Sequence, residues 1–399
     1  MRFADALAQP GLSAIAEVKR RSPSAGDLRP DADPAELAAQ FARAGAAAIS
    51  VLVDERFAGT IDDLRAARAA TDAPLLGKGF FSTKEHLEEL RRAGADAALL
   101  ILRDLDDATC AELLAHAHAI GMDTLVEAHD AEELGRALVL GAPIVGVNAR
   151  DLSTFRIDRR TQLDLVARAA GDRIVIAESG VHTRAQGAAA ELAGADAILV
   201  GSALMQAPDP ATKLRGLLSR PVVKVCGLTR QEDVDAAVEA GADLLGFIFA
   251  EQSPRRAQAV LNVPETALSV AVFVAEVQET PADLVQLHPD DGGSVRSREA
   301  VLLRDGATVA HVLDQPWQGY DPTHWSNAAA AEGRVVLAGG LGPENVRDAI
   351  AAVHPWGVDA SSSLEVQPGV KDHARVRAYI EEARGDRRER AVPVPERER

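Results

Sequence analysis

Cysteines, basic residues and long apolar runs are scarce in this sequence, and each shortage excludes a class of protein. The 399 residues include two cysteines, Cys110 and Cys226, which excludes a disulfide framework and a thiolate zinc site and suits a reducing compartment. No apolar stretch approaches the roughly 20 residues that span a bilayer, and the start, MRFADALAQP, lacks the pattern of a signal peptide. Against 60 Asp and Glu stand 43 Lys and Arg, so the net charge is −17. Nucleic acid and anionic membranes repel such a chain, so we expect neither as a partner and predict a cytoplasmic protein.

What the chain does contain is a repeated local pattern. Helical stretches end in Ala-Gly-Ala and continue at once into a short apolar run, at residues 43–53, 92–102, 192–201 and 239–249. A glycine just past the last turn caps a helix, and an unalternating run of Val, Ile and Leu is typical of a parallel strand buried on both faces. The pattern therefore predicts consecutive βα units.

The first half contains eight such strands. They lie at 15–19, 48–53, 75–80, 97–102, 123–128, 144–149, 174–179 and 197–202. Eight units favour a closed (β/α)8 barrel over an open doubly wound sheet, whose Gly-rich fingerprint after the first strand is missing here.

A Pro-containing stretch at 207–221 interrupts the pattern and marks a boundary. Seven further strands follow, at 222–227, 244–249, 268–274, 284–288, 309–314, 335–340 and 357–362, with a weak eighth at 300–305. We therefore predict an α/β fold of two consecutive (β/α)8 TIM barrels, at 1–215 and 222–384, the second smaller and irregular around 289–308. The charged end, 385–399, predicts a disordered tail.

Polar residues end many strands of the first half, where barrels of this type place their active sites. They are Glu17, Lys19, Lys78, Glu127, Asn148 and Glu178. Any one of them could form a structural ion pair inside the barrel. The whole set favours an acid–base site, because alternating lysines and carboxylates in a desolvated mouth shift each other's pKa.

Small-residue turns after the last two strands predict an anion site. Ser179-Gly180 and Gly201-Ser202 each precede a helix, and backbone N–H groups at such a place bind phosphate. Ser22, in the loop 20–26, adds a hydroxyl. The alternative for each turn alone is an ordinary N-cap.

These residues stand in motifs that resemble indole-3-glycerol phosphate synthase. The motifs are IAEVKRRSPSAGDL (15–28), PLLGKGFF (74–81), LVEAHD (125–130), VGVNARDLSTFRID (145–158), IAESGV (176–181) and ADAILVGSALM (195–205). The resemblance implies ring closure of 1-(2-carboxyphenylamino)-1-deoxyribulose 5-phosphate with loss of CO2 and water. It makes Lys78 the proton donor, Lys19 the partner of the substrate carboxylate and Glu127 the general base. Glu17, Asn148 and Glu178 would support them, and Ser22, Gly180, Gly201 and Ser202 would hold phosphate.

Two features depart from that family. Only about fourteen residues precede the first strand, where the family usually carries a longer segment with a helix over the mouth, so we expect less cover there. Gly79 stands where the family usually has aspartate, beside the proposed acid Lys78.

The second half resembles phosphoribosylanthranilate isomerase. The motifs that carry the resemblance are VVKVCGLT (222–229), SPRR (253–256), VQLH (285–288), LAGGLGPENV (337–346) and VDASSSLEVQPGVKD (358–372). It implies an Amadori rearrangement, with Cys226 as general base and Asp314 as general acid. Arg255 and His288 would contact the substrate, and Gly339, Gly340, Ser361 and Ser362 its phosphate. Taken alone, Cys226 would suit a small buried apolar position.

Departures are larger in this half. Residues 288–314 are shorter than in the family by about one βα unit, and a different loop, 315–325, follows Asp314. The joined hypothesis is a fusion that performs two consecutive steps of tryptophan biosynthesis on phosphorylated small molecules, as a monomer, without metal or cofactor. The alternatives are a synthase with a non-catalytic, phosphate-binding second barrel, and a Schiff-base aldolase that uses Lys78 or Lys19.

Overall fold

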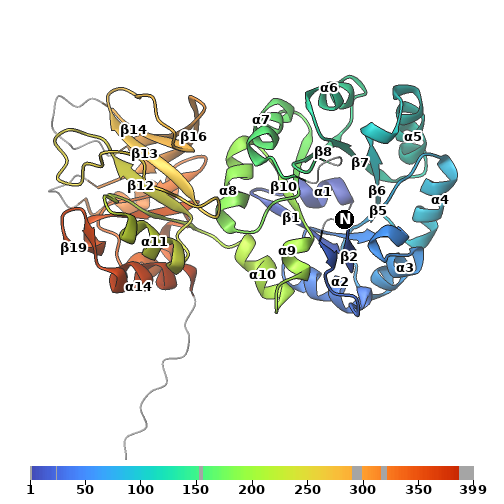
Figure 1. Cartoon of the computed structure of the whole chain (residues 1–399), viewed down its shortest axis with the longest axis horizontal. Coiled ribbons are helices and arrows are strands. Elements are labelled where there is room, and N and C mark those ends of the chain that lie inside the picture. The colour runs from blue at the N-terminus through green and yellow to red at the C-terminus, as the bar shows by residue number, and fades with distance from the viewer. Residues whose placement is uncertain (1, 24, 152–155, 290–298, 316–320, 386–399) are drawn as a thin grey trace, which may run out of the picture. The chain divides into compact units, whose positions relative to one another are not determined.

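The computed structural model describes residues 2–23, 25–151, 156–289, 299–315 and 321–385, which form two compact units, Met1–Leu218 and Ser219–Arg399 (Figure 1). Each unit is built on a closed barrel of eight strands, so the predicted fold class is confirmed. The predicted tail, 385–399, lies outside the described residues except for Gly385. Within the described ranges, no helix has the length and apolarity needed to cross a membrane.

The barrel of the first unit is entirely parallel. Its strands are β1 (Ser13–Val18), β4 (Ala48–Leu52), β5 (Leu75–Lys78), β6 (Ala97–Ile101), β7 (Asp123–Ala128), β8 (Ile144–Asn148), β9 (Ile174–Glu178) and β10 (Ala197–Val200). Around it lie α2 (Pro34–Arg43), α3 (Ile61–Ala70), α4 (Lys84–Ala93), α5 (Asp107–Ala119), α6 (Ala131–Val139), α7 (Arg159–Ala169), α8 (Arg184–Ala193), α9 (Ser202–Met205) and α10 (Pro210–Leu217). The sheet closes where Ser13 of β1 pairs with Ala197 of β10.

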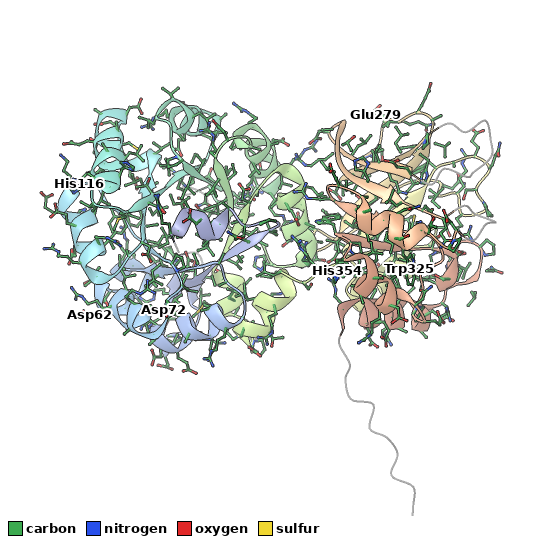
Figure 2. All side chains as sticks on the ribbon, turned by 180° about the vertical axis from the view of Figure 1, so that it is seen from behind. Asp62, Asp72, His116, Glu279, Trp325 and His354 are labelled. Carbon is green, nitrogen blue, oxygen red and sulfur yellow. The ribbon has the colours of Figure 1, made fainter. Side chains whose placement is uncertain are left out.

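The strands are buried on both faces, as the unalternating apolar runs predict. Residues such as Ile15 and Leu76 fill the barrel interior, and their neighbours pack against the helices. Gly94 and Gly194 end α4 and α8 with φ of 102° and 105°, a left-handed conformation that glycine adopts without strain. The outer faces of the helices carry charge, as Asp62 on α3 shows with a side chain that is 81% exposed (Figure 2).

The segment before β1 lies at the far end of the barrel from the strand carboxyl ends. It forms α1 (Phe3–Leu7), whose Phe3 and Leu7 are fully buried among the interior residues of the barrel. Asp123, the first residue of β7, accepts hydrogen bonds from Arg2 at 2.7 Å and from the Ala4 amide at 3.0 Å. This helix therefore closes the bottom of the barrel.

The second barrel is confirmed as irregular. Its strands are β11 (Val222–Val225), β12 (Leu244–Ile248), β13 (Leu268–Val274), β14 (Leu284–His288), β15 (Glu299–Arg304), β16 (Ala307–Leu313), β17 (Val335–Leu337) and β18 (Gly357–Ala360). Its helices are α11 (Gln231–Ala240), α12 (His324–Ala330), α13 (Val346–Val353) and α14 (His373–Arg384), so in the described ranges only four helices accompany eight strands.

The irregularity is a strand that runs the opposite way. β15 pairs antiparallel with both β14 and β16 and joins β16 through Asp305-Gly306, whose φ values are 49° and 82°. Asp-Gly between apolar strands is a strong signal for a two-residue hairpin turn. The weak strand predicted at 300–305 therefore closes the barrel, as half of a hairpin rather than as part of a βα unit.

Candidate active sites

The strand carboxyl ends of the first barrel surround a cavity of about 300 Å³. The predicted residues that line it are Glu17, Lys19, Ser22, Lys78, Glu127, Asn148, Ser179, Gly180, Gly201 and Ser202. Glu178, the remaining predicted residue, is buried and lies in contact with Lys78. The structure thus brings to one mouth a set of residues that are spread over almost 200 positions of the sequence.

Lys78 stands at the end of β5 inside a ring of carboxylates. Its Nζ lies 2.7 Å from Glu178, 3.6 Å from Glu17 and 3.7 Å from Glu127, and its side chain is 14% exposed. Burial disfavours the charge, but these three carboxylates outweigh it and hold the pKa of Lys78 well above its usual range. Lys78 is therefore an ammonium at every physiological pH before substrate binds.

Two glycines make room for the buried carboxylates. A Cβ on Gly146 of β8 would lie 2.0 Å from Glu178 Oε1, and one on Gly201 would lie 2.3 Å from Glu17 Oε1. Both distances are shorter than any tolerable contact, so only glycine leaves these carboxylates in place. Glu17 also pairs with Lys19 at 2.7 Å. Burial would raise the pKa of Glu17, but the charges of Lys19 and Lys78 lower it.

The two carboxylates on either side of Lys78 have opposite tendencies. Burial raises the pKa of Glu178, with the negative charge of Glu127 adding to the rise. The pKa of Glu127 is lowered because His129 and Lys78 outweigh its burial. Of the two, Glu178 is therefore the group that takes up a proton more readily and Glu127 the one that stays ionised, a division that separates acid from base.

His129 was missed by the sequence analysis, although it follows Glu127 by two positions. Its Nε2 lies 3.2 Å from Glu127, and its Nδ1 lies 2.9 Å from Glu133 on α6. Burial opposes the charge of the ring, but the two carboxylates raise the pKa of His129 to about 10. The sequence did hold a signal for His129: residues two apart along an extended chain share a face, so His129 is expected on the same face as Glu127.

The predicted anion site lies on the same rim. Ser179 and Gly180 both have left-handed backbone, with φ of 68° and 75°, and Gly201 directly precedes α9. A non-glycine residue in this conformation is uncommon and is often found where a loop binds a ligand. Arg150, two residues after Asn148, also lines the cavity and was not singled out from the sequence.

Gly79, which stands where the resembling family usually has aspartate, is closely packed: an added Cβ would lie 2.9 Å from the ring of Phe81.

The second barrel places Cys226 and Asp314 at its strand carboxyl ends. Cys226 follows β11 and is 5% exposed, and Gly246 of β12 leaves space for its thiol, since an added Cβ would lie 2.6 Å from Sγ. Burial raises the pKa of Cys226 against the charges of Lys224 and Lys371. Burial raises the pKa of Asp314 to about 7, and the neighbouring Asp359 adds to the rise.

The charge of a buried lysine, Lys224, which was not predicted, acts to lower the pKa of both Cys226 and Asp314. Lys224 Nζ lies 2.6 Å from Asp359 and donates to Gln286 at 3.0 Å. Burial opposes the charge of Lys224, but the negative charge of Asp359 outweighs it and raises the pKa of Lys224 above its usual range. Strand alternation was again an available signal. Lys224 precedes Cys226 by two positions and Asp359 precedes Ser361 by two, so each is expected on the same face of its strand as a predicted site residue. His288, predicted as a substrate contact, has its Nε2 2.9 Å from Gln286.

The predicted phosphate residues follow the last two strands of this barrel. Gly339 and Gly340 come after β17 with φ of 87° and 70°, and Ser361 and Ser362 come after β18. A Cβ on Gly339 would lie 2.8 Å from Asp314 Oδ1. The Ser361 hydroxyl is buried and has no hydrogen-bond partner in the part of the chain that the structure describes.

Comparison with known proteins separates the two halves. Residues 1–217 match the family model of indole-3-glycerol phosphate synthase, and residues 318–382 match that of N-(5'-phosphoribosyl)anthranilate isomerase. Tryptophan biosynthesis protein TrpCF of Yersinia pestis is 37% identical over 93% of this chain and 84% of its own length. Indole-3-glycerol phosphate synthase 2 of Streptomyces coelicolor is 48% identical over 54% of this chain and 84% of its own. The solved structure of TrpF from Jonesia denitrificans is 30% identical and covers 42% of this chain and 98% of its own, with a TM-score of 0.34.

Proposed function

Since this chain belongs to the bifunctional family that joins an indole-3-glycerol phosphate synthase to a phosphoribosylanthranilate isomerase in tryptophan biosynthesis, we propose how its own side chains divide the two reactions. The second barrel isomerises N-(5-phosphoribosyl)anthranilate to 1-(2-carboxyphenylamino)-1-deoxyribulose 5-phosphate by an Amadori rearrangement. The first barrel closes the indole ring of that product with loss of CO2 and water. The product of one barrel is thus the substrate of the other.

In the first barrel, the ring of buried carboxylates around the Lys78 ammonium carries the proposal. Lys78 protonates the substrate carbonyl as it becomes a hydroxyl, which the charged state of this lysine favours. Lys19 and Arg150 hold the carboxylate that leaves as CO2. Loss of CO2 restores the aromatic benzene ring. Glu127, ionised beside His129, then takes a proton from the CH2 carbon next to the ring nitrogen, and Glu178 gives a proton to the hydroxyl that leaves as water. Glu17 and Asn148 orient these groups.

In the second barrel, Cys226 takes the proton from C2 of the aminoaldose and Asp314 protonates the ring oxygen. Asp314 suits this role because a carboxyl group with a pKa of about 7 still holds a proton near neutral pH. Cys226 must act as a thiolate, and Lys224 and Lys371 supply the positive charge that favours it. Arg255 and His288 hold the anthranilate part of the substrate.

Phosphate binding follows the same plan in both barrels. Ser22, Ser179, Gly180, Gly201 and Ser202 surround the phosphate in the first, and Gly339, Gly340, Ser361 and Ser362 in the second. In the part of the chain that the structure describes, a single chain supplies the proposed residues of each site, which supports a monomer, and a reducing cytoplasm preserves the Cys226 thiol. Sedimentation of the purified chain tests the monomer, since a dimer would double the mass.

Paired steady-state assays test the assignment. Lys78→Met should abolish ring closure and leave isomerisation intact, and Cys226→Ala should do the opposite, so each activity is the control for the other. A wild-type chain that closes the ring but turns over no phosphoribosylanthranilate would identify the second barrel as non-catalytic. Isomerase turnover that survives Cys226→Ala would remove this cysteine from the mechanism.

A further inference from the structure

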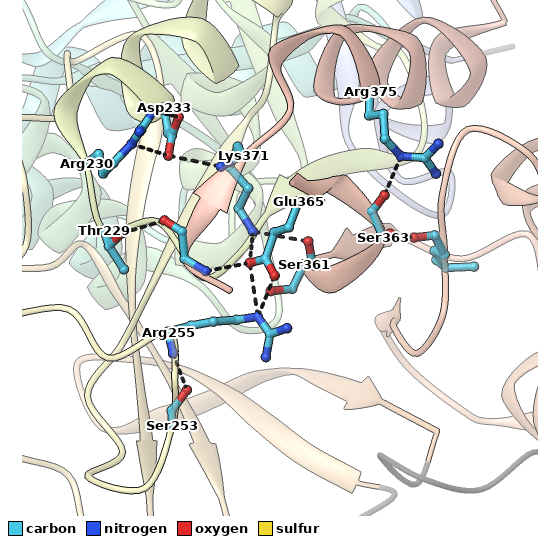
Figure 3. Close-up of polar contacts among 12 residues, drawn as sticks. Thr229, Arg230, Asp233, Ser253, Arg255, Ser361, Ser363, Glu365, Lys371 and Arg375 are labelled. Atoms are coloured by element: carbon cyan, nitrogen blue, oxygen red, sulfur yellow. Dashed lines mark hydrogen bonds and ion pairs between the residues drawn. The ribbon is translucent and has the colours of Figure 1, made fainter. Parts of the chain in front are cut away.

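Three charged side chains, Arg255, Glu365 and Lys371, form a buried cluster (Figure 3). Lys371 lies near enough to Cys226 to act on the pKa of its thiol. Arg255 Nε lies 2.9 and 3.0 Å from the two carboxylate oxygens of Glu365. Lys371 Nζ donates to Glu365 at 2.8 Å and to the Ser361 carbonyl at 3.1 Å. We refer to these three residues as the Arg255 cluster.

The burial of the Arg255 cluster is graded. The side chain of Lys371 is 0% exposed, that of Glu365 4% and that of Arg255 16%. Two cations share one carboxylate, so the cluster carries an excess of positive charge while Lys371 is protonated; burial lowers the pKa of Lys371, and Glu365 opposes that effect. Lys371 is fully buried, so Arg255 is the member of the cluster that can present positive charge to the substrate at the carboxyl ends of the strands of the second barrel. A neutral Arg255–Glu365 pair would attract an anion far less.

The hairpin that carries Glu365 and Lys371 is tied to the loop after Cys226. It consists of β19 (Glu365–Gln367) and β20 (Val370–Lys371). Thr229 donates to the Gly369 carbonyl at 2.6 Å, and Asp233 on α11 accepts from the Lys371 amide at 3.2 Å. The Asp233 carboxylate is itself fixed by Arg230 at 3.0 Å. Glu365 is therefore held by backbone anchors and has little freedom to follow Arg255.

The guanidinium is bound on one side only. In the described part of the chain, Nε of Arg255 is engaged by Glu365, while its two terminal nitrogens have no hydrogen-bond partner and point away from the cluster (Figure 3). The Arg255 side chain also lies close to Gly227, where an added Cβ would be 3.0 Å from its Cδ. Two parallel N–H groups fixed at this edge match a planar carboxylate.

We propose that Glu365 is the positioning residue that aims Arg255 at the carboxylate of the anthranilate ring, and that Lys371 keeps the cluster cationic for this anion. The inference rests on the proposed function of the second barrel. It makes Glu365 and Lys371 determinants of substrate specificity, although neither touches the reacting atoms.

Glu365→Gln separates positioning from simple charge. The substitution removes a negative charge beside Arg255, so an effect of charge alone would lower the KM for phosphoribosylanthranilate. Loss of positioning should instead raise that KM and lower kcat/KM roughly ten- to a hundredfold. The aniline analogue, which lacks the ring carboxylate, should change less than about threefold, because Arg255 has nothing to bind there.

Matched variants complete the test. Lys371→Met removes positive charge from both Cys226 and the cluster, so it should slow the turnover of both substrates and, in addition, lower the preference for the carboxylate-bearing one. Glu382→Gln removes an outer Glu–Arg pair of the same kind, Arg347 Nε to Glu382 at 2.8 Å, and should leave both substrates unaffected. If Glu365→Gln loses native tryptophan emission, Glu365→Asp carries the test, since the shorter charged side chain should give a smaller loss of preference.

The outcomes are distinct. An equal loss with both substrates would make Glu365 merely structural and overturn the inference, as would tighter binding by Glu365→Gln. A wild-type chain without isomerase turnover would overturn the proposed function, and the role of Glu365 with it. A selective loss for the carboxylate-bearing substrate supports the inference.

Discussion

The absence of a Cβ at two glycines decides where the buried carboxylates of the first barrel's site lie. Glu178 and Glu17 can be buried beside Lys78 and Lys19 because the neighbouring strands carry no side chain at Gly146 and Gly201. Each carboxylate occupies the space that a Cβ would fill. The acid–base arrangement thus depends on two glycines that have no side chain to take part in proton transfer.

Gly146→Ala tests this dependence. The added methyl group would lie 2.0 Å from Glu178 Oε1 and force the carboxylate away from Lys78, so the synthase kcat/KM should fall at least about tenfold. Gly135→Ala is the matched control, since nothing lies within 4 Å of a Cβ at this helical position. It should keep full activity and add about 0.5–1 kcal/mol to stability. Equal activities of the two variants would refute the steric argument.

His129 should make the stability of the first unit depend on pH. Its pKa is raised from 6.5 to about 10 in the folded state, so the stabilisation is fully present below pH 6.5 and is lost as the pH rises through about 10. The difference in free energy of unfolding between wild type and His129→Gln should therefore shrink across this interval, as urea unfolding at several pH values can measure. His118→Gln, at an exposed position of α5, is the control for the loss of a histidine side chain from the same unit. A difference that stays constant for His129→Gln would show that the ring is neutral.

At the scale of elements, the second barrel replaces a βα unit by a hairpin. The antiparallel strand β15 supplies the pairing that closes the barrel between β14 and β16. Its register requires the Asp305-Gly306 turn, which holds both residues at positive φ. Closure of the barrel thus depends on local turn chemistry rather than on a covering helix.

Gly306→Ala should lower the free energy of unfolding of the second unit by about 1 kcal/mol. No atom lies within 4 Å of the added Cβ, so the cost is the left-handed backbone alone, at φ 82°. Asp305→Asn should be neutral, because asparagine suits the same conformation. Urea unfolding followed by tryptophan emission measures both. An unchanged midpoint for Gly306→Ala would mean that the turn has another form in solution.

At the scale of the whole molecule, the two units carry different spectroscopic signals. The three tryptophans of the sequence stand at positions 317, 325 and 356, all within Ser219–Arg399; Trp325 is labelled in Figure 2. Tryptophan emission therefore reports the second unit, and far-ultraviolet circular dichroism reports both. Each unit has its own apolar core, so we expect two unfolding transitions.

Leu76→Ala should separate these transitions. Leu76 is 0% exposed inside the first barrel, and its truncation should cost that unit about 2–5 kcal/mol. The circular dichroism midpoint of the first unit should move to lower urea, while the tryptophan midpoint stays in place. A matching shift in tryptophan emission would show that the two barrels unfold as one.

Much of this protein was accessible from the sequence because its signals are local. Helix-capping glycines and buried runs of Val, Ile and Leu predict the strands, and parallel strands bring Glu17, Lys78, Glu127 and Glu178 to one mouth by geometry alone. The motifs that resemble the two families led to the same residues, and the family comparisons confirmed the two activities. Asp305-Gly306 is likewise a local signal, for a hairpin turn, which a prediction of parallel strands alone does not use.

Other features were decided only by the tertiary structure. Strand alternation places His129 and Lys224 on the same side of the chain as Glu127 and Cys226. It does not tell that His129 lies between two carboxylates, that Lys224 meets Asp359 across the barrel, or that Glu365 holds Arg255 at 2.9 Å from a hairpin 110 residues away. Charges and pKa values depend on distances between side chains and on exclusion of water, and both arise only when the barrel closes. The sequence by itself determined which residues could do the chemistry. Packing determined which of them hold a proton more readily and which position a charged group against the substrate.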